Sequence, residues 1–236
     1  MIMRALDSVP SISRDHQCES CTIRDIVLFA DLIPSDISSI HAKIDDFIYS
    51  TGDLLFERGG IANFLFTIHA GMVKLVRRGN DGRDRIVRVL RKGDLLGIEA
   101  LGSTEYSNDA IALTQLQVCK IPLNVIQDLN RRSPRLHARL MQKWQQALQD
   151  AEDWIADLNF GTAKKRVANL LLKMRHPDEP NITTVFSRAD MGAMLDLKFE
   201  TVSREVSGFV QVGAIAQKDS MGRVYEILDE ARLHSA

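Results

Sequence analysis

The chain has 236 residues, with 30 Lys and Arg against 31 Asp and Glu, a formal net charge of −1 and 45% hydrophobic residues. This composition is typical of a globular protein and excludes a collagen-like, disordered or strongly polybasic chain. The longest aliphatic run is only the leucines at 170–172, and residues 1–20 are polar. We therefore expect no membrane span, no secretory signal and a cytoplasmic location.

The cysteine count and the charge balance each leave a function open. Three cysteines are too few for a disulfide framework, so we expect reduced thiols or metal ligands. A net charge near zero does not exclude nucleic-acid binding, because phosphate contacts need only a local basic surface.

The N-terminal half is predicted to be a short lead-in followed by a β domain. Residues 1–30 are a polar segment that contains Cys18-Glu19-Ser20-Cys21. Residues 31–132 include short runs rich in Val, Ile, Leu and Phe that alternate with glycine-containing turns, a pattern typical of a small antiparallel barrel or sandwich. The clearest strands are predicted at 64–68, 72–76, 85–90 and 117–121, with a hairpin turn at 79–82.

A long helix is predicted over residues 133–159, starting at Ser133-Pro134 and ending before Gly161. Its length is roughly 37 Å. One apolar stripe follows the spacing of a coiled-coil seam and consists of Leu140, Trp144, Ala147, Ala151, Trp154 and Leu158. The helix could pack on its own barrel, but its length exceeds what a small barrel covers, so we favour a parallel helix pair in a homodimer.

Residues 160–236 are predicted to form a second, mostly helical domain. Thr162 caps its first helix, and residues 214–227 are expected to form a hairpin. The fold class is therefore α+β, with an N-terminal β-barrel, a long helix and a C-terminal helical domain.

The strongest functional signal lies between residues 187 and 209. Ser187-Arg188-Ala189-Asp190 is a capping-box variant that opens a short helix, and a tight turn follows at Asp196-Leu197. In the next helix Glu200, Ser203 and Arg204 share one face, opposite an apolar face. This arrangement indicates a winged helix-turn-helix, since Arg reads guanine edges and Glu accepts from cytosine. A solvated helix face with an intrahelical ion pair is the plain alternative.

The order barrel, long helix and winged helix-turn-helix resembles the cyclic-AMP receptor and fumarate–nitrate regulator (CRP/FNR) family of bacterial transcription factors, and it covers nearly the whole chain. Three stretches carry the resemblance: Gly93 to Gly97, Val118 to Pro122 and Leu195 to Arg204. It implies a sensory barrel of the cyclic-nucleotide-binding, double-stranded β-helix type. It also implies a homodimer on TTGAT-like inverted repeats of promoter DNA, with RNA polymerase as a partner. The residues expected to contact DNA are Arg188, Lys198, Glu200, Thr201, Ser203 and Arg204.

Two positions depart from the family's helix-turn-helix. Asp196 stands where the turn usually has Gly, and Asp tolerates the left-handed conformation at modest cost. Lys198 replaces the usual Ser or Thr cap, so a cap is lost and a phosphate partner is gained.

The resemblance also suggests signals for the barrel. The cyclic-nucleotide branch holds the phosphate with an Arg-Ser pair, whereas this chain has Tyr106-Ser107 at about that place. Cyclic AMP is therefore not expected, because its phosphate would lack a cation. His41 and His69 could serve as axial ligands of a haem, which some members of the family use, although lone histidines are more often structural or exposed.

The oxygen-sensing branch binds a four-iron four-sulfur cluster through three N-terminal cysteines and one in the barrel. Cys18, Cys21 and Cys119 match three of these positions, and the resemblance makes them candidate ligands. The fourth cysteine is missing, and His16 or Asp25 could complete the set. The alternative is a cluster-free, ligand-independent or differently liganded regulator in which Cys119 is a buried apolar residue.

An enzyme is not expected, because the sequence has no nucleophile–base–acid set, no glycine-rich phosphate loop and no H-x-x-x-H motif. A remaining alternative is an interaction protein whose helix-turn-helix does not bind DNA.

Overall fold

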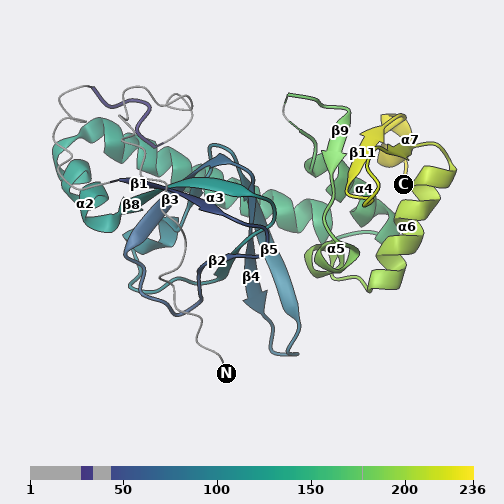
Figure 1. Ribbon diagram of the computed structural model, residues 1–236, viewed down its shortest axis with the longest axis horizontal. Coiled ribbons are helices and arrows are strands. Elements are labelled where there is room, and N and C mark those ends of the chain that lie inside the picture. The colour runs from purple at the N-terminus through teal and green to yellow at the C-terminus, as the bar shows by residue number, and fades with distance from the viewer. Residues whose placement is uncertain (1–27, 34–43, 177) are drawn as a thin grey trace. The chain divides into compact units, whose positions relative to one another are not determined.

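The computed structural model describes residues 28–33, 44–176 and 178–236 (Figure 1). The chain divides into two compact units, one with residues up to 77 and 88–148, the other with residues 78–87 and 149–236. In the described part, no helix is both long enough and apolar enough to cross a membrane.

The strands of the N-terminal part form two four-stranded sheets with the orders β1-β8-β3-β6 and β2-β7-β4-β5. The predicted strands are confirmed as β3, β4, β5 and β8. The bounds are β1 Asp45–Tyr49, β2 Leu54–Phe56, β3 Phe64–Ala70, β4 Met72–Arg78, β5 Asp84–Arg91, β6 Leu95–Leu96, β7 Asp109–Ala112 and β8 Leu116–Pro122.

The expected double-stranded β-helix is confirmed, but its sheets do not close into one barrel. The edge strands are β1 and β6 in one sheet and β2 and β5 in the other, and in the described part none of them joins the two sheets by a ladder. The sheets instead pack through apolar side chains, and the rings of Phe56 and Phe66 lie 5.9 Å apart between them. The domain is therefore a jelly-roll-like sandwich.

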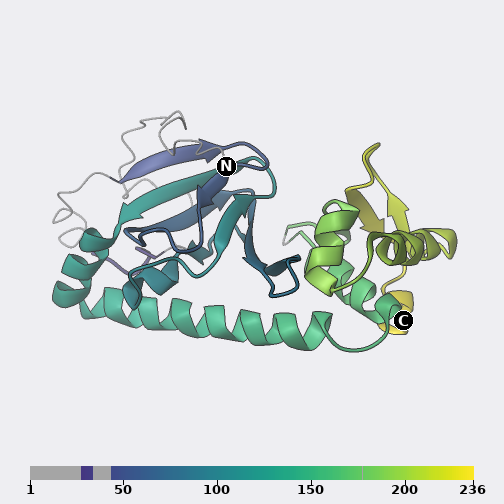
Figure 2. The same ribbon diagram turned by 90° about the horizontal axis from the view of Figure 1, so that it is seen from below.

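Helices follow the last strand of the sandwich. Helix α2 (Leu123–Arg132) begins directly after β8 and buries Val125, Ile126 and Leu129. A short 3₁₀ helix, η3 (Ile98–Leu101), lies earlier in the chain, between β6 and β7. Helix α3 (Pro134–Leu158) is one unbroken helix of 25 residues, as predicted (Figure 2). Proline at its first position lacks only an N–H that would be unpaired there anyway.

The C-terminal part contains the predicted helices and hairpin. Thr162 caps α4 by accepting a hydrogen bond from the Lys165 backbone N–H at 3.1 Å. A small sheet with the order β10-β11-β9 supplies the wing. The bounds are α4 Ala163–Lys173, β9 Ile182–Thr184, α5 Arg188–Leu195, α6 Phe199–Gln211, β10 Ile215–Gln217, β11 Val224–Ile227 and α7 Glu230–His234.

Candidate nucleic-acid interface and sensor residues

A tight turn sets the angle between α5 and α6. Ser187 caps α5, since its Oγ accepts from the Asp190 N–H at 3.0 Å and donates to the Asp190 carboxylate at 2.8 Å. Asp196 ends α5 in the left-handed conformation, with φ 51° and ψ 48°. The Leu197 N–H then donates to the Gly192 carbonyl at 3.0 Å. A Cβ on Gly192 would lie 2.6 Å from the Leu197 carbonyl oxygen, so only glycine permits this close turn.

Helix α6 has one buried and one polar face. Val202, Val206 and Phe209 are fully buried against the rest of the unit. Glu200 and Arg204 are exposed and Ser203 is half-buried, each one turn or less from the next. The helix therefore presents a carboxylate, a hydroxyl and a guanidinium from its first two turns.

The guanidinium of Arg204 is ordered by its neighbour in the free chain. Its Nε and a terminal nitrogen donate to the Glu205 carboxylate at 3.2 and 3.1 Å. The Arg204 side chain is nonetheless 72% exposed, so this pair is weak and its geometry leaves the guanidinium accessible.

The remaining residues expected to contact DNA lie in different environments. Lys198 is exposed at the N-terminus of α6 and makes no side-chain cap bond, and Thr201 is half-buried. Arg188 is directed toward the wing strand β11, where it donates to the Tyr225 hydroxyl at 2.8 Å. Its guanidinium also lies 5.8 Å from the centre of the Tyr225 ring. The structure thus gives Arg188 a role in joining α5 to the wing.

The wing carries two cations that the sequence reasoning did not single out, Lys218 and Arg223. Arg223 is exposed, and Lys218 pairs with Glu226 at 3.0 Å. The wing turn is fixed by Asp219, whose pKa is lowered because its carboxylate accepts the N–H groups of Val224 and Arg223, each at 2.8 Å. From the sequence alone, a basic residue in a hairpin loop that contacts DNA looks the same as an ordinary solvated charge.

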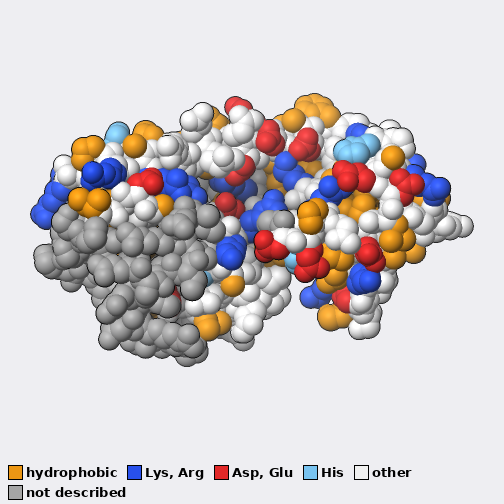
Figure 3. Space-filling model, turned by 90° about the horizontal axis from the view of Figure 1, so that it is seen from above, with side chains coloured by type: hydrophobic (Ala, Val, Ile, Leu, Met, Phe, Trp, Pro, Cys, Tyr) orange, Lys and Arg blue, Asp and Glu red, His pale blue; other side chains and the backbone are white. Residues whose placement is uncertain are grey.

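The polar residues of this unit do not add up to a uniformly basic surface. Figure 3 shows basic and acidic side chains intermixed over the described part of the face that it draws. This distribution agrees with the formal net charge of −1. Any attraction to phosphate must therefore be local, around Lys198, Arg204 and the wing.

The long helix α3 exposes a different stripe from the predicted seam. Of the predicted residues, Leu140, Trp154 and Leu158 are buried in their own chain, whereas Trp144 is exposed and Ala147 and Ala151 are half-buried. The exposed large apolar residues include Trp144 of the predicted seam and three residues that each follow a predicted position by one. They are Met141, Trp144, Leu148 and Ile155.

Aromatic rings occupy the interior of the sandwich where η3 meets it. Tyr106 stacks on Phe56 at 3.7 Å between ring centres, and its hydroxyl donates to the Phe64 carbonyl at 2.8 Å. Burial raises the pKa of Tyr106 to about 12. A cation contacts the two residues that follow Tyr106 in the chain. Arg77 on β4 donates to the Ser107 carbonyl at 3.2 Å and to the Asn108 side chain at 3.0 Å, on the exposed side.

Cys119 is half-buried on β8, between β1 and β3. The structure places it beside Asp46 and His69, which the sequence reasoning did not connect to it. Cross-strand register brings them together, and register between strands separated by fifty or more residues is not visible in the sequence. Four other candidate ligands lie outside the described residues: Cys18, Cys21, His16 and Asp25. His41, proposed together with His69 for a haem, lies outside them as well.

Two family models match the chain. Residues 47–133 match the cyclic nucleotide-binding domain, and residues 165–236 match the Crp-like helix-turn-helix domain. The first match spans most of the sandwich with α2, and the second spans α4 to α7.

Curated relatives match over most of the chain. The "Fumarate and nitrate reduction regulatory protein" of Salmonella typhi is 27% identical over 210 residues, which cover 85% of this chain and 83% of that protein. The "Transcriptional activator protein FnrL" of Cereibacter sphaeroides is 27% identical, with 97% and 94% covered. Among solved structures, FixK2 from Bradyrhizobium japonicum has a TM-score of 0.74 at 24% identity, with 82% of this chain and 97% of that chain covered.

Proposed function

The chain belongs to the CRP/FNR family of transcription regulators, and from this premise we propose that it binds promoter DNA as a homodimer, each α6 reading a TTGAT-like half-site. The observation that carries the proposal is the polar face of α6, on which Glu200, Ser203 and Arg204 stand opposite a buried apolar face. RNA polymerase is the partner that such a regulator implies.

The side chains of α6 suit the edges of bases in the major groove. The Arg204 guanidinium can donate two parallel hydrogen bonds to guanine O6 and N7, and the Glu200 carboxylate can accept from cytosine N4. To reach a base, Arg204 exchanges its contact with Glu205 for the guanine edge. This exchange costs little because the side chain is largely in water.

The contacts outside α6 position the helix and carry no sequence information. Lys198 stands at the N-terminus of α6, where the helix dipole and the missing cap already favour a phosphate. Arg223 and Lys218 of the wing extend the same attraction along the backbone of the duplex. Arg188 supports this arrangement indirectly, since it ties α5 to Tyr225 of β11.

Dimerisation is assigned to the exposed stripe of α3, formed by Met141, Trp144, Leu148 and Ile155. With the half-buried Ala151, these side chains follow alternating spacings of three and four residues, as in a coiled-coil seam. Two parallel α3 helices would set the two recognition helices about one turn of DNA apart.

The signal is not cyclic AMP in this proposal. Tyr106 and Phe56 fill the interior beside η3, and the Tyr106 hydroxyl is committed to the Phe64 carbonyl. Arg77, which donates to the Ser107 carbonyl and to the Asn108 side chain, lies on the exposed side. A cyclic phosphate would need this interior space and a buried cation.

A four-iron four-sulfur cluster on Cys18, Cys21 and Cys119 is the finer expectation for the cofactor, and the chain fits it poorly. The cluster is ordinarily held by four thiolates, and the sequence has three cysteines. The donors that the structure places next to Cys119 are a carboxylate and an imidazole, which are harder ligands than thiolate. The DNA-binding function proposed above does not depend on the cluster.

Fluorescence anisotropy on a labelled duplex tests the recognition face. The duplex carries a TTGAT inverted repeat, and a second duplex has the guanine of each half-site replaced. We expect Arg204→Ala to remove about 1–3 kcal/mol of discrimination at that guanine in each half-site. Lys198→Ala should weaken both duplexes equally and reduce the slope of log affinity against log salt by about 0.9 for each phosphate that the variant no longer neutralises.

Gln211→Ala, at the exposed C-terminal end of α6, is the matched control and should bind like the wild type. Unchanged affinity and unchanged base preference in Arg204→Ala would refute the recognition-face assignment. A chain that binds neither duplex would instead be the interaction protein considered above.

A further inference from the structure

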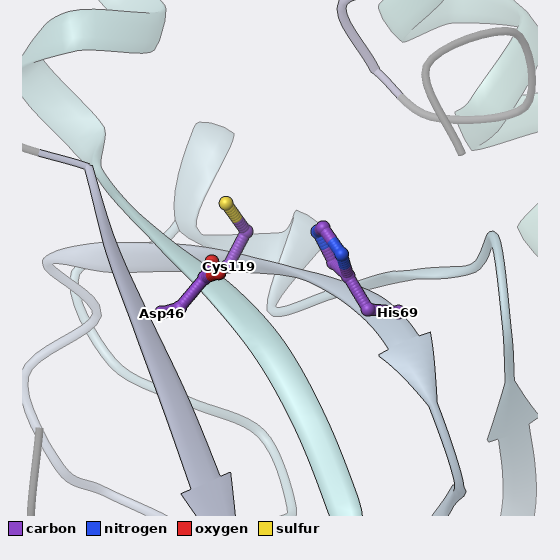
Figure 4. A group of neighbouring side chains, drawn as sticks. All are labelled: Asp46, His69 and Cys119. Atoms are coloured by element: carbon purple, nitrogen blue, oxygen red, sulfur yellow. The ribbon is translucent and has the colours of Figure 1, made fainter. Parts of the chain in front are cut away.

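One face of the sheet β1-β8-β3-β6 gathers three different metal-ligating side chains, Asp46, His69 and Cys119 (Figure 4). Asp46 on β1 is the register partner of Cys119 on β8, and Cys119 is also the partner of Thr67 on β3. His69 lies where the register of β3 against β8 shifts between Ile68 and Ala70, and this irregularity brings its ring beside Asp46 and Cys119. The carboxylate oxygen, ring nitrogen and sulfur all lie within 4.8 Å of one another.

We propose that Asp46, His69 and Cys119 bind a single divalent cation of borderline softness, Zn²⁺ or Fe²⁺. Thiolate, imidazole and carboxylate are the three ligand types that Zn²⁺ takes in proteins, at about 2.3, 2.0 and 2.0–2.2 Å. Tetrahedral ligands at those lengths are about 3.3–3.8 Å apart, so small side-chain rotations close the observed spacing onto one ion. The hard cations Ca²⁺ and Mg²⁺ would not select the sulfur.

The environment of the three side chains favours a cation. Asp46 is only 4% exposed, and His69 and Cys119 are half-buried. Taking a carboxylate and a thiolate out of water together is unfavourable, and a divalent ion between them offsets both negative charges. Three protein ligands leave the fourth tetrahedral position for water or another donor.

The same geometry distinguishes this site from a four-iron cluster. Each protein ligand of a cluster binds a different iron atom, so its donors must be spread around the cluster. Here the three donors are grouped closely enough for one ion, and only one of them is sulfur. Because Cys119 would serve either site, the two metal centres exclude each other.

Hydrogen bonds connect the strand that carries His69 to the helix assigned to dimerisation. Ile68, next to His69, exchanges backbone hydrogen bonds with the segment after β5, accepting from the Gly93 N–H at 2.9 Å and donating to the Asp94 carbonyl at 3.2 Å. The Gly93 carbonyl in turn accepts from the Lys143 ammonium on α3 at 2.8 Å. The strand that carries His69 is therefore linked to α3 by hydrogen bonds through Gly93 and Lys143.

Metal titration of the full-length chain tests the proposal. Protein stripped of metal in the absence of oxygen is titrated with Co²⁺, which reports tetrahedral thiolate ligation by a sulfur-to-metal charge-transfer band and visible ligand-field bands. We expect saturation at one ion per chain and displacement of Co²⁺ by Zn²⁺. Iron and sulfide are measured in parallel on protein purified without oxygen, with at most one iron and no sulfide expected.

Variants identify the ligands. Cys119→Ser should abolish the charge-transfer band, and His69→Gln and Asp46→Asn should each weaken Co²⁺ binding at least tenfold. The double variant Cys18→Ser, Cys21→Ser and the control His176→Ala, whose ring contacts Thr184 in the C-terminal part, should bind as the wild type does. Thermal unfolding of each metal-free variant shows whether it folds.

The wild-type stoichiometry decides the question even where a variant fails to fold. Four irons with four sulfides per chain, lost in the Cys18, Cys21 double variant, would overturn the proposal in favour of the cluster. A Co²⁺ band that survives in Cys119→Ser, or no saturable binding at all, would also overturn it. None of these outcomes bears on the reading of DNA by α6, which is measured separately.

Discussion

At the scale of single residues, the contacts of several side chains differ from those that the neighbouring sequence suggests. Arg188 lies in a motif typical of DNA contact, and the structure directs it to the Tyr225 hydroxyl. Tyr106, which the resemblance to the cyclic-nucleotide branch places near the expected ligand-binding pair, is buried and stacks on Phe56. Such settings arise from tertiary packing, so local sequence does not reveal them.

Burial of Tyr106 has a consequence for stability at high pH. Its pKa is raised by burial from 10.0 to about 12, and that of Tyr49 is raised similarly by burial and by Asp53. Below pH 10 both phenols are protonated whether the chain is folded or unfolded. Between about 10 and about 12 only the unfolded chain loses these protons, so the free energy of unfolding should fall as pH rises through this window.

An absorbance titration of phenolate formation checks this prediction. In the wild type, Tyr49 and Tyr106 should titrate later than a model phenol. Tyr106→Phe should remove one late-titrating group and flatten the alkaline loss of stability. Titration of all three phenols together near the ordinary value would contradict the buried setting.

At the scale of elements, the helix-turn-helix was predictable because its signals are local. Ser187, Thr162 and the Asp196 turn each act on residues within four positions, and each forms as the sequence indicates. The strands at 64–68 and 117–121 were also predictable from their composition, but their pairing was not. The predicted closed barrel is therefore wrong, since the strands form two separate sheets. The neighbours of Cys119 are likewise seen only in the structure.

The turn between α5 and α6 should be intolerant of any side chain at Gly192. Gly192→Ala would place a Cβ 2.6 Å from the Leu197 carbonyl oxygen, which is backbone and must move. We expect a loss of about 1–3 kcal/mol in the free energy of unfolding, by the cost of overpacking. Denaturant unfolding of the full chain measures it.

Gly208→Ala in α6 is the matched control for this turn. Its added Cβ meets no atom within 4 Å. Alanine in an unobstructed helical position should raise the free energy of unfolding by about 0.5–1 kcal/mol. If both variants changed stability in the same direction, the close approach at Gly192 would not be the cause.

At the scale of the whole molecule, the proposed function requires two copies of the chain. Of the predicted seam on α3, Leu140, Trp154 and Leu158 are buried within one chain, whereas Trp144 is exposed. A helix with two apolar stripes can pack either stripe against its own domain, and the sequence does not identify which one. The structure leaves Leu148 57% exposed and Ile155 53% exposed, and these positions now define the proposed seam.

A charge in this seam should separate the protomers. Leu148→Glu places two carboxylates opposite each other in a parallel pair, so light scattering should report a monomer. Affinity for the inverted repeat should fall by about 100-fold or more, because the second half-site is no longer bound by a tethered partner. Gln142→Glu, on the opposite side of α3, should leave the dimer intact; a dimeric Leu148→Glu would place the interface elsewhere.

Sequence-specific DNA binding is best measured as the affinity of the wild-type chain for two duplexes of equal length and composition. One carries the TTGAT inverted repeat, the other has both half-sites scrambled, and both are measured over a series of salt concentrations. We expect tighter binding to the repeat by a factor of about 1,000 or more at physiological salt. Equal affinity for both duplexes at every salt concentration would contradict sequence-specific reading by α6.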